Sequence, residues 1–337
     1  MENFKIYYHD DMDGICSRVI AEKIIRQRYI VKCIIEVYDL SHGAYDFNKL
    51  AEITGDEALV IIVDYSFNEN TIDTFKEILR KTDSGRRLLW IDHHDSSINF
   101  VRDHILPDGP GEHLDIPYSS FLVSKSGSGA YLTWAAYKPK TFISEIDSQY
   151  EVIDMYKVIK FVPPVVRYVS DYDTFEHRLP DTDKFKLGFD STIDKYSLIV
   201  DLLRSTTDEC NSTISIGENV MNYVIAENKE VIKKQGYESR ILDIGTGKIE
   251  MVYVCNRLSN SWVFGDLYDC YKYVVVYYFD GVDYKYSIFS NLKIFNDTDC
   301  EHFAKQFGGG GHKGAAGWRS KELMFIKDNF VFKGTLY

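Results

Sequence analysis

Long hydrophobic runs and signal-like segments are absent from this chain of 337 residues. No apolar run approaches the ~20 residues that a helix needs to cross a bilayer, so we expect no contact with a membrane. Residues 1–14 contain no basic segment followed by an apolar one, and we expect no signal peptide. The six cysteines include no CxxC pair, which disfavours disulfides and a zinc–cysteine site and favours a cytoplasmic protein with reduced thiols.

Basic residues are also scarce. Lys and Arg number 39 against 51 Asp and Glu, which gives a formal net charge of −12. Binding of a long nucleic acid duplex generally needs a basic stripe, and the chain has none. An anionic substrate is therefore expected to be small and to meet bound cations rather than a groove of Lys and Arg. Solubility is the alternative explanation of the acidic charge.

Strand-like and helix-like segments alternate in the first part of the chain. Apolar strand-like runs occur at residues 4–8, 31–38, 58–63 and 87–91. Helical spacing occurs at 14–29, 68–81 and 126–137, over most of 146–168, and at 193–235. Strands that are apolar throughout and alternate with helices predict a parallel sheet covered on both faces.

After about residue 240 the character changes to β-rich segments at 248–255 and 271–278, and to a hairpin with Asp280-Gly281 at its turn. The predicted fold class is α/β, with an N-terminal parallel-sheet domain joined by a helical linker to a smaller mixed α/β domain. We place the first domain at 1–195, the linker at 196–240 and the second domain at 241–337.

Acidic and histidine residues follow three of the predicted strands. The groups are His9-Asp10-Asp11-Met12-Asp13, Asp64, and Asp92-His93-His94, and a fourth group, Ser170-Asp171-Tyr172-Asp173, follows an apolar helical stretch. Ligands of open α/β sheets bind at the carboxyl ends of the strands, where these groups would meet. So many carboxylates repel one another unless cations neutralise them, and mixed carboxylate and imidazole ligands suit two manganese ions. Capping of the next helix is the structural alternative for a single residue such as Asp13.

Residues 308–311 are four consecutive glycines, and His312 follows them. Such a run lets the backbone approach a ligand closely and can turn its N–H groups towards an anion. We expect Gly309, Gly310, Gly311 and His312 to contact a substrate phosphate, and residues 315–317 to begin a helix. A flexible loop without a ligand is the alternative.

The ordered motifs HDDMDG, VDYS, DHH, SDYD and GGGH-x-x-AAG resemble those of the DHH phosphoesterase superfamily, in its members with the DHH-associated C-terminal domain. This group includes nanoRNases, RecJ-type exonucleases and cyclic-dinucleotide phosphodiesterases. The resemblance covers both halves of the chain. It implies a DHH catalytic domain at 1–195 and a DHH-associated substrate-binding domain at 241–337, with the active site in the cleft between the two domains. It also implies two bound Mn²⁺ ions, with Mg²⁺ or Co²⁺ as alternatives.

The resemblance also implies a role for each matching residue. Asp64 would bridge the two ions, and His9 would either bind the first ion or shape the site. Asp92 would orient the histidines, His94 would contact the phosphate, and water or hydroxide on the metal would attack phosphorus. The implied metal ligands are His9, Asp11, Asp13, Asp64, His93 and Asp171.

Two positions depart from the pattern of this superfamily. Many members have a ligand histidine four residues before the first Asp, where this chain has Tyr7. NanoRNases often have Ser-Leu-Arg-Ser upstream of the glycine run, where this chain has the sequence Ser-Ile-Phe-Ser, with Phe289 in place of the arginine. Arg257 or Lys293 could substitute for that arginine, and Phe289 could stack on a base.

The implied function is hydrolysis of short oligonucleotides or linear dinucleotides to 5′-mononucleotides. The alternatives are a phosphatase that acts on nucleotides such as 3′-phosphorylated adenosine phosphate, a phosphodiesterase that acts on cyclic nucleotides or dinucleotides, and a nucleotide sensor without turnover. The expected partner is the short nucleotide substrate, and a homodimer is compatible with the sequence.

Overall fold

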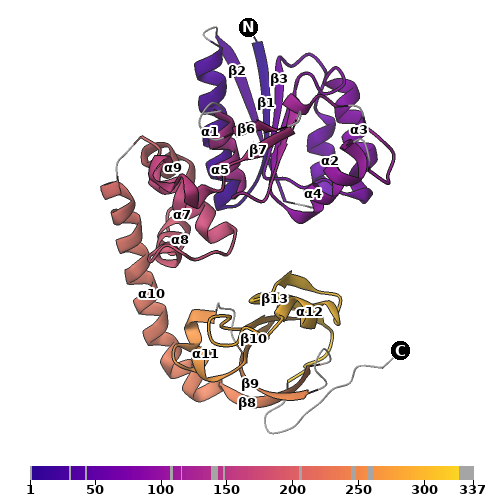
Figure 1. Cartoon of the computed structure of the whole chain (residues 1–337). Coiled ribbons are helices and arrows are strands. Elements are labelled where there is room, and N and C mark those ends of the chain that lie inside the picture. The colour runs from indigo at the N-terminus through magenta and orange to yellow at the C-terminus, as the bar shows by residue number, and fades with distance from the viewer. Residues whose placement is uncertain are drawn as a thin grey trace. The chain divides into compact units, whose positions relative to one another are not determined.

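The computed structural model describes residues 2–29, 32–41, 44–106, 109–114, 116–137, 143–146, 149–204, 207–243, 248–256 and 261–325. The chain divides into two compact units, Met1–Asn219 (unit 1) and Val220–Tyr337 (unit 2). The division falls inside one long helix, α10 (Thr207–Gln235), and within the segment expected to link the domains (Figure 1). Among the described residues, no helix combines the length and the apolar character that crossing a membrane requires.

Unit 1 is built on a five-stranded parallel sheet in the order β2–β1–β3–β4–β5. The strands are β1 (Glu2–His9), β2 (Cys33–Leu40), β3 (Leu59–Val63), β4 (Leu88–Asp92) and β5 (Phe121–Val123). Strand β1 pairs in parallel with β2 on one side and with β3 on the other, so the order of the strands reverses beside β1. Open sheets bind their ligands at such a point, outside the carboxyl ends of the strands.

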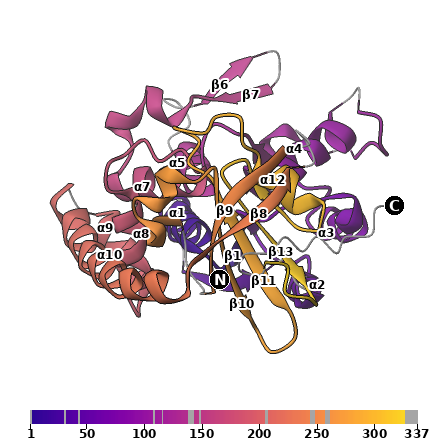
Figure 2. The ribbon, with the colours of Figure 1, turned by 90° about the horizontal axis from the view of Figure 1, so that it is seen from below.

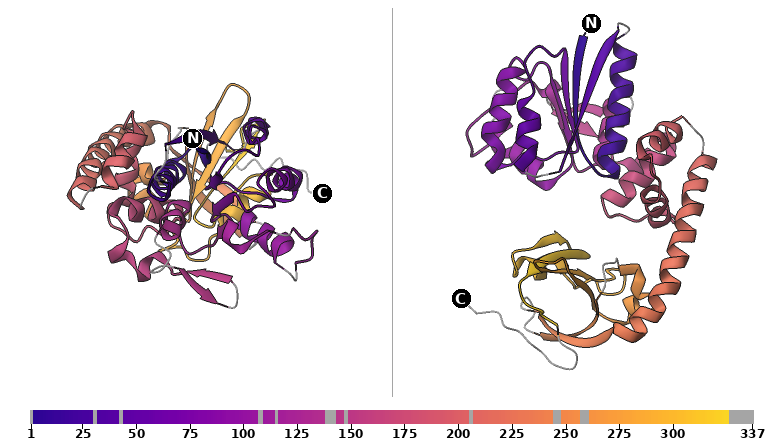
Figure 3. Two further views of the ribbon diagram at one scale, coloured as in Figure 1. Left: turned by 90° about the horizontal axis from the view of Figure 1, so that it is seen from above. Right: turned by 180° about the vertical axis from the view of Figure 1, so that it is seen from behind.

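Helices cover both faces of this sheet (Figure 3). Helices α1 (Met12–Arg28) and α5 (Gly129–Tyr137) lie on one face, and α2 (Ala44–Ala51), α3 (Ile72–Lys81) and α4 (Asp95–Phe100) on the other. In β3, Ile61 and Val63 belong to the first core, whereas Val60 and Ile62 belong to the second. Burial on both sides is why the strands are apolar throughout rather than alternating.

The helix expected over most of 146–168, with an interruption at Pro163-Pro164, is wrong up to residue 152, and residues 155–157 and 159–161 form only short 3₁₀ helices. Strands β6 (Ile143–Ile146) and β7 (Gln149–Val152) form a separate antiparallel hairpin, which projects from the rest of unit 1 (Figure 2). Helix α7 (Pro164–Asp173) begins only at Pro164, because proline fits the first turn of a helix but not its interior. Helices α8 (Thr182–Asp190) and α9 (Lys195–Leu202) follow.

Unit 2 contains a six-stranded mixed sheet in the order β12–β13–β11–β10–β9–β8. The strands are β8 (Tyr237–Asp243), β9 (Lys248–Asn256), β10 (Tyr273–Phe279), β11 (Tyr284–Phe289), β12 (Gly310–His312) and β13 (Ala315–Ser320). Helix α12 (Cys300–Lys305) packs on one face through Phe303, and the end of α10 packs on the other through Ile232. The predicted α/β class, with a parallel sheet followed by a mixed one, is confirmed.

The expectation that residues 315–317 begin a helix is wrong. These residues open β13, which pairs antiparallel with β11 and places Ala316 opposite Ile288. Both side chains are buried in the same core. Small residues suit this position because the neighbouring glycine run lies directly against β13, with Gly310 opposite Gly317.

Candidate metal centre

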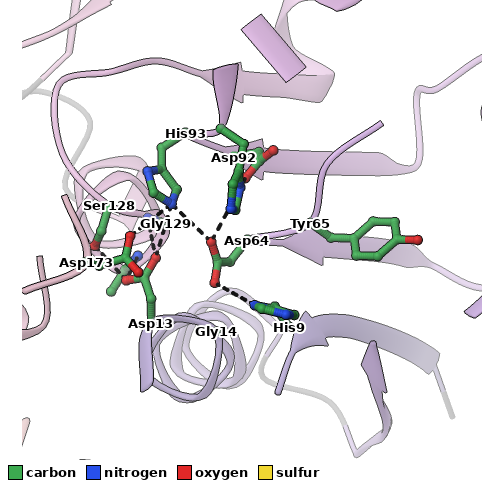
Figure 4. Close-up of polar contacts among 12 residues, drawn as sticks. His9, Asp13, Gly14, Asp64, Tyr65, Asp92, His93, Ser128, Gly129 and Asp173 are labelled. Atoms are coloured by element: carbon green, nitrogen blue, oxygen red, sulfur yellow. Dashed lines mark hydrogen bonds and ion pairs between the residues drawn. The ribbon is translucent and has the colours of Figure 1, made fainter. Parts of the chain in front are cut away.

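The polar residues that follow β1, β3 and β4 gather at the carboxyl edge of the sheet in unit 1 (Figure 4). Three overlapping groups of residues could each hold a metal ion. Within each group, one ligand atom of every residue lies within 4.8 Å of those of the others. The groups are His9, Asp11 and Asp64; Asp13, His93 and Asp173; and Asp64, Asp92, His93 and His94. Five of the six ligands implied by the motifs therefore come together, and Asp171 does not.

Asp64 lies at the centre of the cluster. It follows β3 directly, is 1 % exposed, and has a φ of +54°, which a residue other than glycine adopts at some cost in strain. Its Oδ1 lies 3.3 Å from Nε2 of His93, and its Oδ2 lies 3.9 Å from Nδ1 of His9. The two carboxylate oxygens thus face different groups of ligands, as a bridging carboxylate must.

Several buried atoms of the cluster have ion-pair neighbours but make no hydrogen bond. Among the described residues, this holds for both carboxylate oxygens of Asp64, for Nε2 of His93 and for Oδ2 of Asp173. Buried polar atoms without hydrogen bonds are costly. Carboxylate oxygens and an imidazole nitrogen that converge in this way fit a divalent cation, and the residues present therefore suit a metal site.

Asp13 is anchored by the start of helix α5. Its Oδ1 accepts hydrogen bonds from the hydroxyl of Ser128 (2.6 Å) and the N–H of Ala130 (2.9 Å), and its Oδ2 accepts one from the N–H of Gly129 (2.7 Å). A Cβ atom at Gly129 would lie 2.9 Å from Oδ2 of Asp13 and 2.9 Å from Cβ of Asp64. The sequence analysis did not identify Ser128 and Gly129 as residues of the site. The sequence Ser-Gly-Ser-Gly at the start of a helix could have indicated them, because the first N–H groups of a helix are free to bind a carboxylate.

Asp11 has both a structural and a site-facing oxygen. As the N-cap of α1, it accepts a hydrogen bond from the N–H of Gly14 through Oδ1 (2.9 Å), while its Oδ2 lies 2.9 Å from Nδ1 of His9. Capping therefore falls to Asp11 and not to Asp13. A Cβ at Gly14 would lie 1.9 Å from the carbonyl oxygen of His9, so glycine is needed for the helix to begin this close to the strand.

Asp92 and His94 form a second pair at the end of β4. Asp92 is fully buried, and its Oδ1 accepts a hydrogen bond from Nδ1 of His94 at 2.8 Å. Its Oδ2 accepts a hydrogen bond from the hydroxyl of Ser97, in α4. Burial would raise the pKa of Asp92, but the contacts with His94 and Ser97 outweigh it and lower that pKa. Asp92 is thus a charged group that fixes the orientation of the His94 ring.

Asp171, expected to be a ligand, is used elsewhere. Its Oδ1 accepts hydrogen bonds from the hydroxyl of Tyr156 and the N–H of Arg178 (2.8 Å), and its Oδ2 from the N–H of Leu179 (3.0 Å) and the hydroxyl of Thr182. These bonds hold the loop between α7 and α8 and leave no oxygen facing the cluster.

The residue that faces the cluster from α7 is Asp173. Its Oδ2 lies 3.0 Å from Nε2 of His93. The two aspartates are two residues apart in one helix, so their side chains point in nearly opposite directions. The sequence motif contains both aspartates, and Asp173 is the one that lies in the cluster.

The surroundings change how these groups bind protons. Burial raises the pKa of Asp13 to about 7, and the nearby charge of Asp173 contributes. Burial and the charge of Asp13 hold the pKa of Asp64 well above its usual range. Burial would lower the pKa of His93, but the carboxylates of Asp173 and Asp64 outweigh it and raise that pKa well above its usual value. Without a metal, protons thus take the place of cations in this cluster.

The remaining sequence candidates lie outside the cluster. Tyr7, at the position of the family histidine, is fully buried in the core shared with α2 and α3 and stacks on Tyr38 at 4.9 Å between ring centres. In unit 2, the ring of Phe289 is partly buried against the core that contains Phe264. Arg257 lies outside the described residues.

The glycine run is only partly available to a ligand. The N–H groups of Gly308 and Gly309 close helix α12, donating to the carbonyl oxygens of Lys305 (3.1 Å) and Ala304 (3.0 Å). Gly310, Gly311 and His312 form the exposed strand β12. Any contact of these three residues with a substrate stays a prediction.

Comparison with known proteins adds three similarities. Uncharacterized protein R106 of Acanthamoeba polyphaga mimivirus is 24% identical over 208 residues, which are 58% of this chain and 41% of that protein. The pGpG-specific phosphodiesterase PggH of Vibrio cholerae matches with a TM-score of 0.44 and 14% identity over 95% of this chain and 93% of that one. RecJ of Thermus thermophilus, solved in complex with Mn²⁺, matches with a TM-score of 0.48 and 11% identity over 94% of this chain and 49% of that one.

No family model matches the chain. The chain spans less than half the length of the curated relative it matches. At these levels of identity and TM-score, the two likenesses carry no conclusion about the family, activity or substrate of this chain.

Proposed function

We propose that the chain is a metal-dependent phosphoesterase that binds two divalent ions, Mn²⁺ in preference to Mg²⁺ or Co²⁺, and hydrolyses short oligonucleotides or linear dinucleotides to 5′-mononucleotides. The observation that supports it best is the buried carboxylate of Asp64, whose two oxygens make no hydrogen bond and face two different groups of ligands. His9 and Asp11 would hold one ion, and Asp13, His93 and Asp173 the other, with Asp173 in place of the Asp171 implied by the motifs.

The chemistry follows from this set of residues. When bound, two divalent ions neutralise a phosphate and lower the pKa of a water ligand. Asp92 holds Nδ1 of His94 and so fixes the ring that would contact a phosphate oxygen. The three donors from Ser128, Gly129 and Ala130 fix both oxygens of Asp13. Preset ligands of this kind reduce the reorganisation needed during the reaction.

The experiment is an assay of the whole chain with Mn²⁺ on a panel of phosphoesters. The panel contains pApA, pGpG, five-mers, 30-mers, cyclic dinucleotides, 3′-phosphorylated adenosine phosphate, and the general diester bis(p-nitrophenyl) phosphate. We expect the linear dinucleotides and five-mers to be cleaved fastest, with no cleavage in EDTA. Faster cleavage of the 30-mer contradicts the substrate size, and binding without turnover of any substrate supports the sensor alternative instead.

Asp64→Asn keeps the shape of the side chain and removes its charge. Loss of an outer partner of a metal ligand costs about 10–100-fold, so loss of a bridging ligand is expected to exceed about 100-fold. The matched control is Asp73→Asn, an exposed aspartate in the first turn of α3, which is expected to keep full activity. Retention of most activity in Asp64→Asn contradicts the bridging role.

A further inference from the structure

The backbone around Asp64 is tied to strand β4 at two points. The N–H of Asp64 donates a hydrogen bond to the carbonyl oxygen of Ile91 at 2.8 Å. One residue later, the carbonyl oxygen of Tyr65 accepts a hydrogen bond from the indole Nε1 of Trp90 at 3.0 Å. The strand register brings this donor close, because Trp90 lies opposite Ile62, near the end of β3. The two bonds therefore enclose the residue whose φ is +54°.

The indole ring of Trp90 is held in a fixed orientation. It is fully buried, and the rings of Phe67, Phe75 and Phe100 lie around it, with ring centres 5.3, 5.2 and 6.1 Å away. All three contacts are edge-to-face, an arrangement that aromatic pairs prefer, and together they fix the plane of the indole. The direction of its N–H is therefore set before any ion binds.

The side chain of Tyr65 forms a second anchor, and its ring points away from the cluster (Figure 4). Burial, together with the carboxylate of Asp46 to which its hydroxyl donates a hydrogen bond, raises the pKa of Tyr65. Asp46 is buried in the first turn of α2, and both of its oxygens lie 3.1 Å from the N–H of Ser41. The residue that follows Asp64 is thus fastened to α2 as well as to β4.

The strained backbone of Asp64 needs such anchors, because a conformation of this kind persists only where the surrounding structure over-determines it. We propose that Trp90 and Tyr65 are positioning residues of the metal centre, which hold Asp64 in the conformation that turns its two oxygens to two groups of ligands. Trp90 lies outside the motifs that carry the family resemblance. The inference rests on the proposed function in taking Asp64 as a ligand shared by two ions.

The experiment is calorimetric titration of Mn²⁺ into the full chain and into Trp90→Phe, which keeps a buried ring and removes the indole N–H. Outer partners of metal ligands contribute about 10–100-fold to affinity, so we expect Trp90→Phe to bind Mn²⁺ at least about tenfold more weakly. The matched control is Trp318→Phe, since Trp318 is buried in unit 2 and its Nε1 donates to Sδ of Met324 at 3.0 Å. We expect both variants to melt at a lower temperature and only Trp90→Phe to lose affinity.

A milder variant keeps the test decisive if Trp90→Phe does not fold. Tyr65→Phe removes only the hydroxyl bonded to Asp46 and is expected to weaken Mn²⁺ binding about three- to tenfold, the equivalent of one hydrogen bond. A crystal structure of metal-free Trp90→Phe gives a readout that does not depend on an ion. We expect φ of Asp64 to leave the left-handed region in that structure.

Wild-type affinity for Mn²⁺ in both variants overturns the inference, as does an equal loss of affinity in Trp318→Phe. So does a φ of Asp64 that stays near +54° in Trp90→Phe. These results are distinct from those that test the proposed function. If the wild type binds Mn²⁺ and cleaves dinucleotides while Trp90→Phe binds Mn²⁺ equally well, only the positioning roles are refuted. Loss of affinity in Trp90→Phe, with no cleavage by the wild type, supports these roles and refutes the function. A wild type that binds no divalent ion overturns both.

Discussion

The affinity of the cluster for Mn²⁺ is expected to rise with pH between about 5.5 and 7.5. Asp13, Asp64 and His93 all have raised pKa values in the metal-free chain. The folded metal-free chain therefore holds protons that the ligands must release when an ion binds. Every released proton makes binding weaker at lower pH.

The size of the effect can be worked out from Asp13 alone. With a pKa of about 7, its protonation at pH 5.5 costs about 2 kcal/mol, or roughly 30-fold in affinity, at about 1.36 kcal/mol for each pH unit below that pKa. The raised pKa values of Asp64 and His93 act in the same direction and make the dependence on pH steeper. We therefore expect the affinity for Mn²⁺ to fall at least about 30-fold between pH 7.5 and 5.5.

Stability changes in the opposite direction when no metal is present. Folding raises the pKa of Asp13 from 3.8 to about 7, so the folded chain binds this proton more tightly than the unfolded chain does. The group therefore stabilises the fold least above pH 7, where the folded chain loses that proton too. The melting temperature in EDTA is thus expected to fall as the pH rises from 5.5 to 7.5. At a Mn²⁺ concentration about 100 times the Kd, binding adds about 2.7 kcal/mol, or roughly 5–10 °C for a unit of this size.

The measurement is calorimetric titration of Mn²⁺ into the metal-free chain at pH 5.5, 6.5 and 7.5. Buffers with different ionisation enthalpies give the number of protons released, and melting curves with EDTA and with Mn²⁺ run beside it. An affinity for Mn²⁺ that is constant over this range, or that rises on acidification, refutes the reasoning. So does binding without proton release at pH 6.5.

Three further changes test individual contacts. Gly129→Ala is expected to lower the affinity for Mn²⁺ at least about tenfold, because its Cβ would lie 2.9 Å from Oδ2 of Asp13; calorimetry that finds wild-type affinity counts against this arrangement. Asp92→Asn is expected to reduce kcat about 10–100-fold with the metal still bound, which steady-state kinetics and metal analysis together check. Asp171→Asn is expected to lower stability in EDTA by about 1–3 kcal/mol, since the amide nitrogen cannot accept the two hydrogen bonds that one of the carboxylate oxygens accepts; an unchanged melting curve would instead favour a role as a metal ligand.

The meeting of the polar residues at the strand ends was predictable, because each of these residues follows a strand-like run of mainly apolar residues. Apolar runs such as 59–63 need burial on both faces, which specifies a parallel sheet, and parallel strands bring their carboxyl ends to one edge. Asp64, His93 and the residues after β1 therefore meet as expected. The predicted boundaries of these strands differ from the observed ones by about two residues at most, as fraying ends allow.

Other features depend on packing that no local pattern contains. Which of Asp171 and Asp173 faces the cluster depends on how α7 is rotated about its axis. No pattern in the sequence shows that the N–H of Arg178 turns back to bond Asp171. Ser128 and Gly129 reach Asp13 only through the tertiary fold. Residues 315–317 have a composition that suits a helix, but pairing with β11 overrides that propensity.

The anchoring of Asp13 also determines when the centre can form during synthesis of the chain. The donors from Ser128 and Gly129 lie 115 and 116 residues after Asp13. At about 5–20 residues per second, a ribosome needs roughly 6–23 s to add the first of them. Until then the acidic segment at 9–13 lacks the partners that hold it, and contacts of such long sequence separation form late in folding. An ion bound at this centre would therefore enter a nearly finished unit and would not guide its early folding.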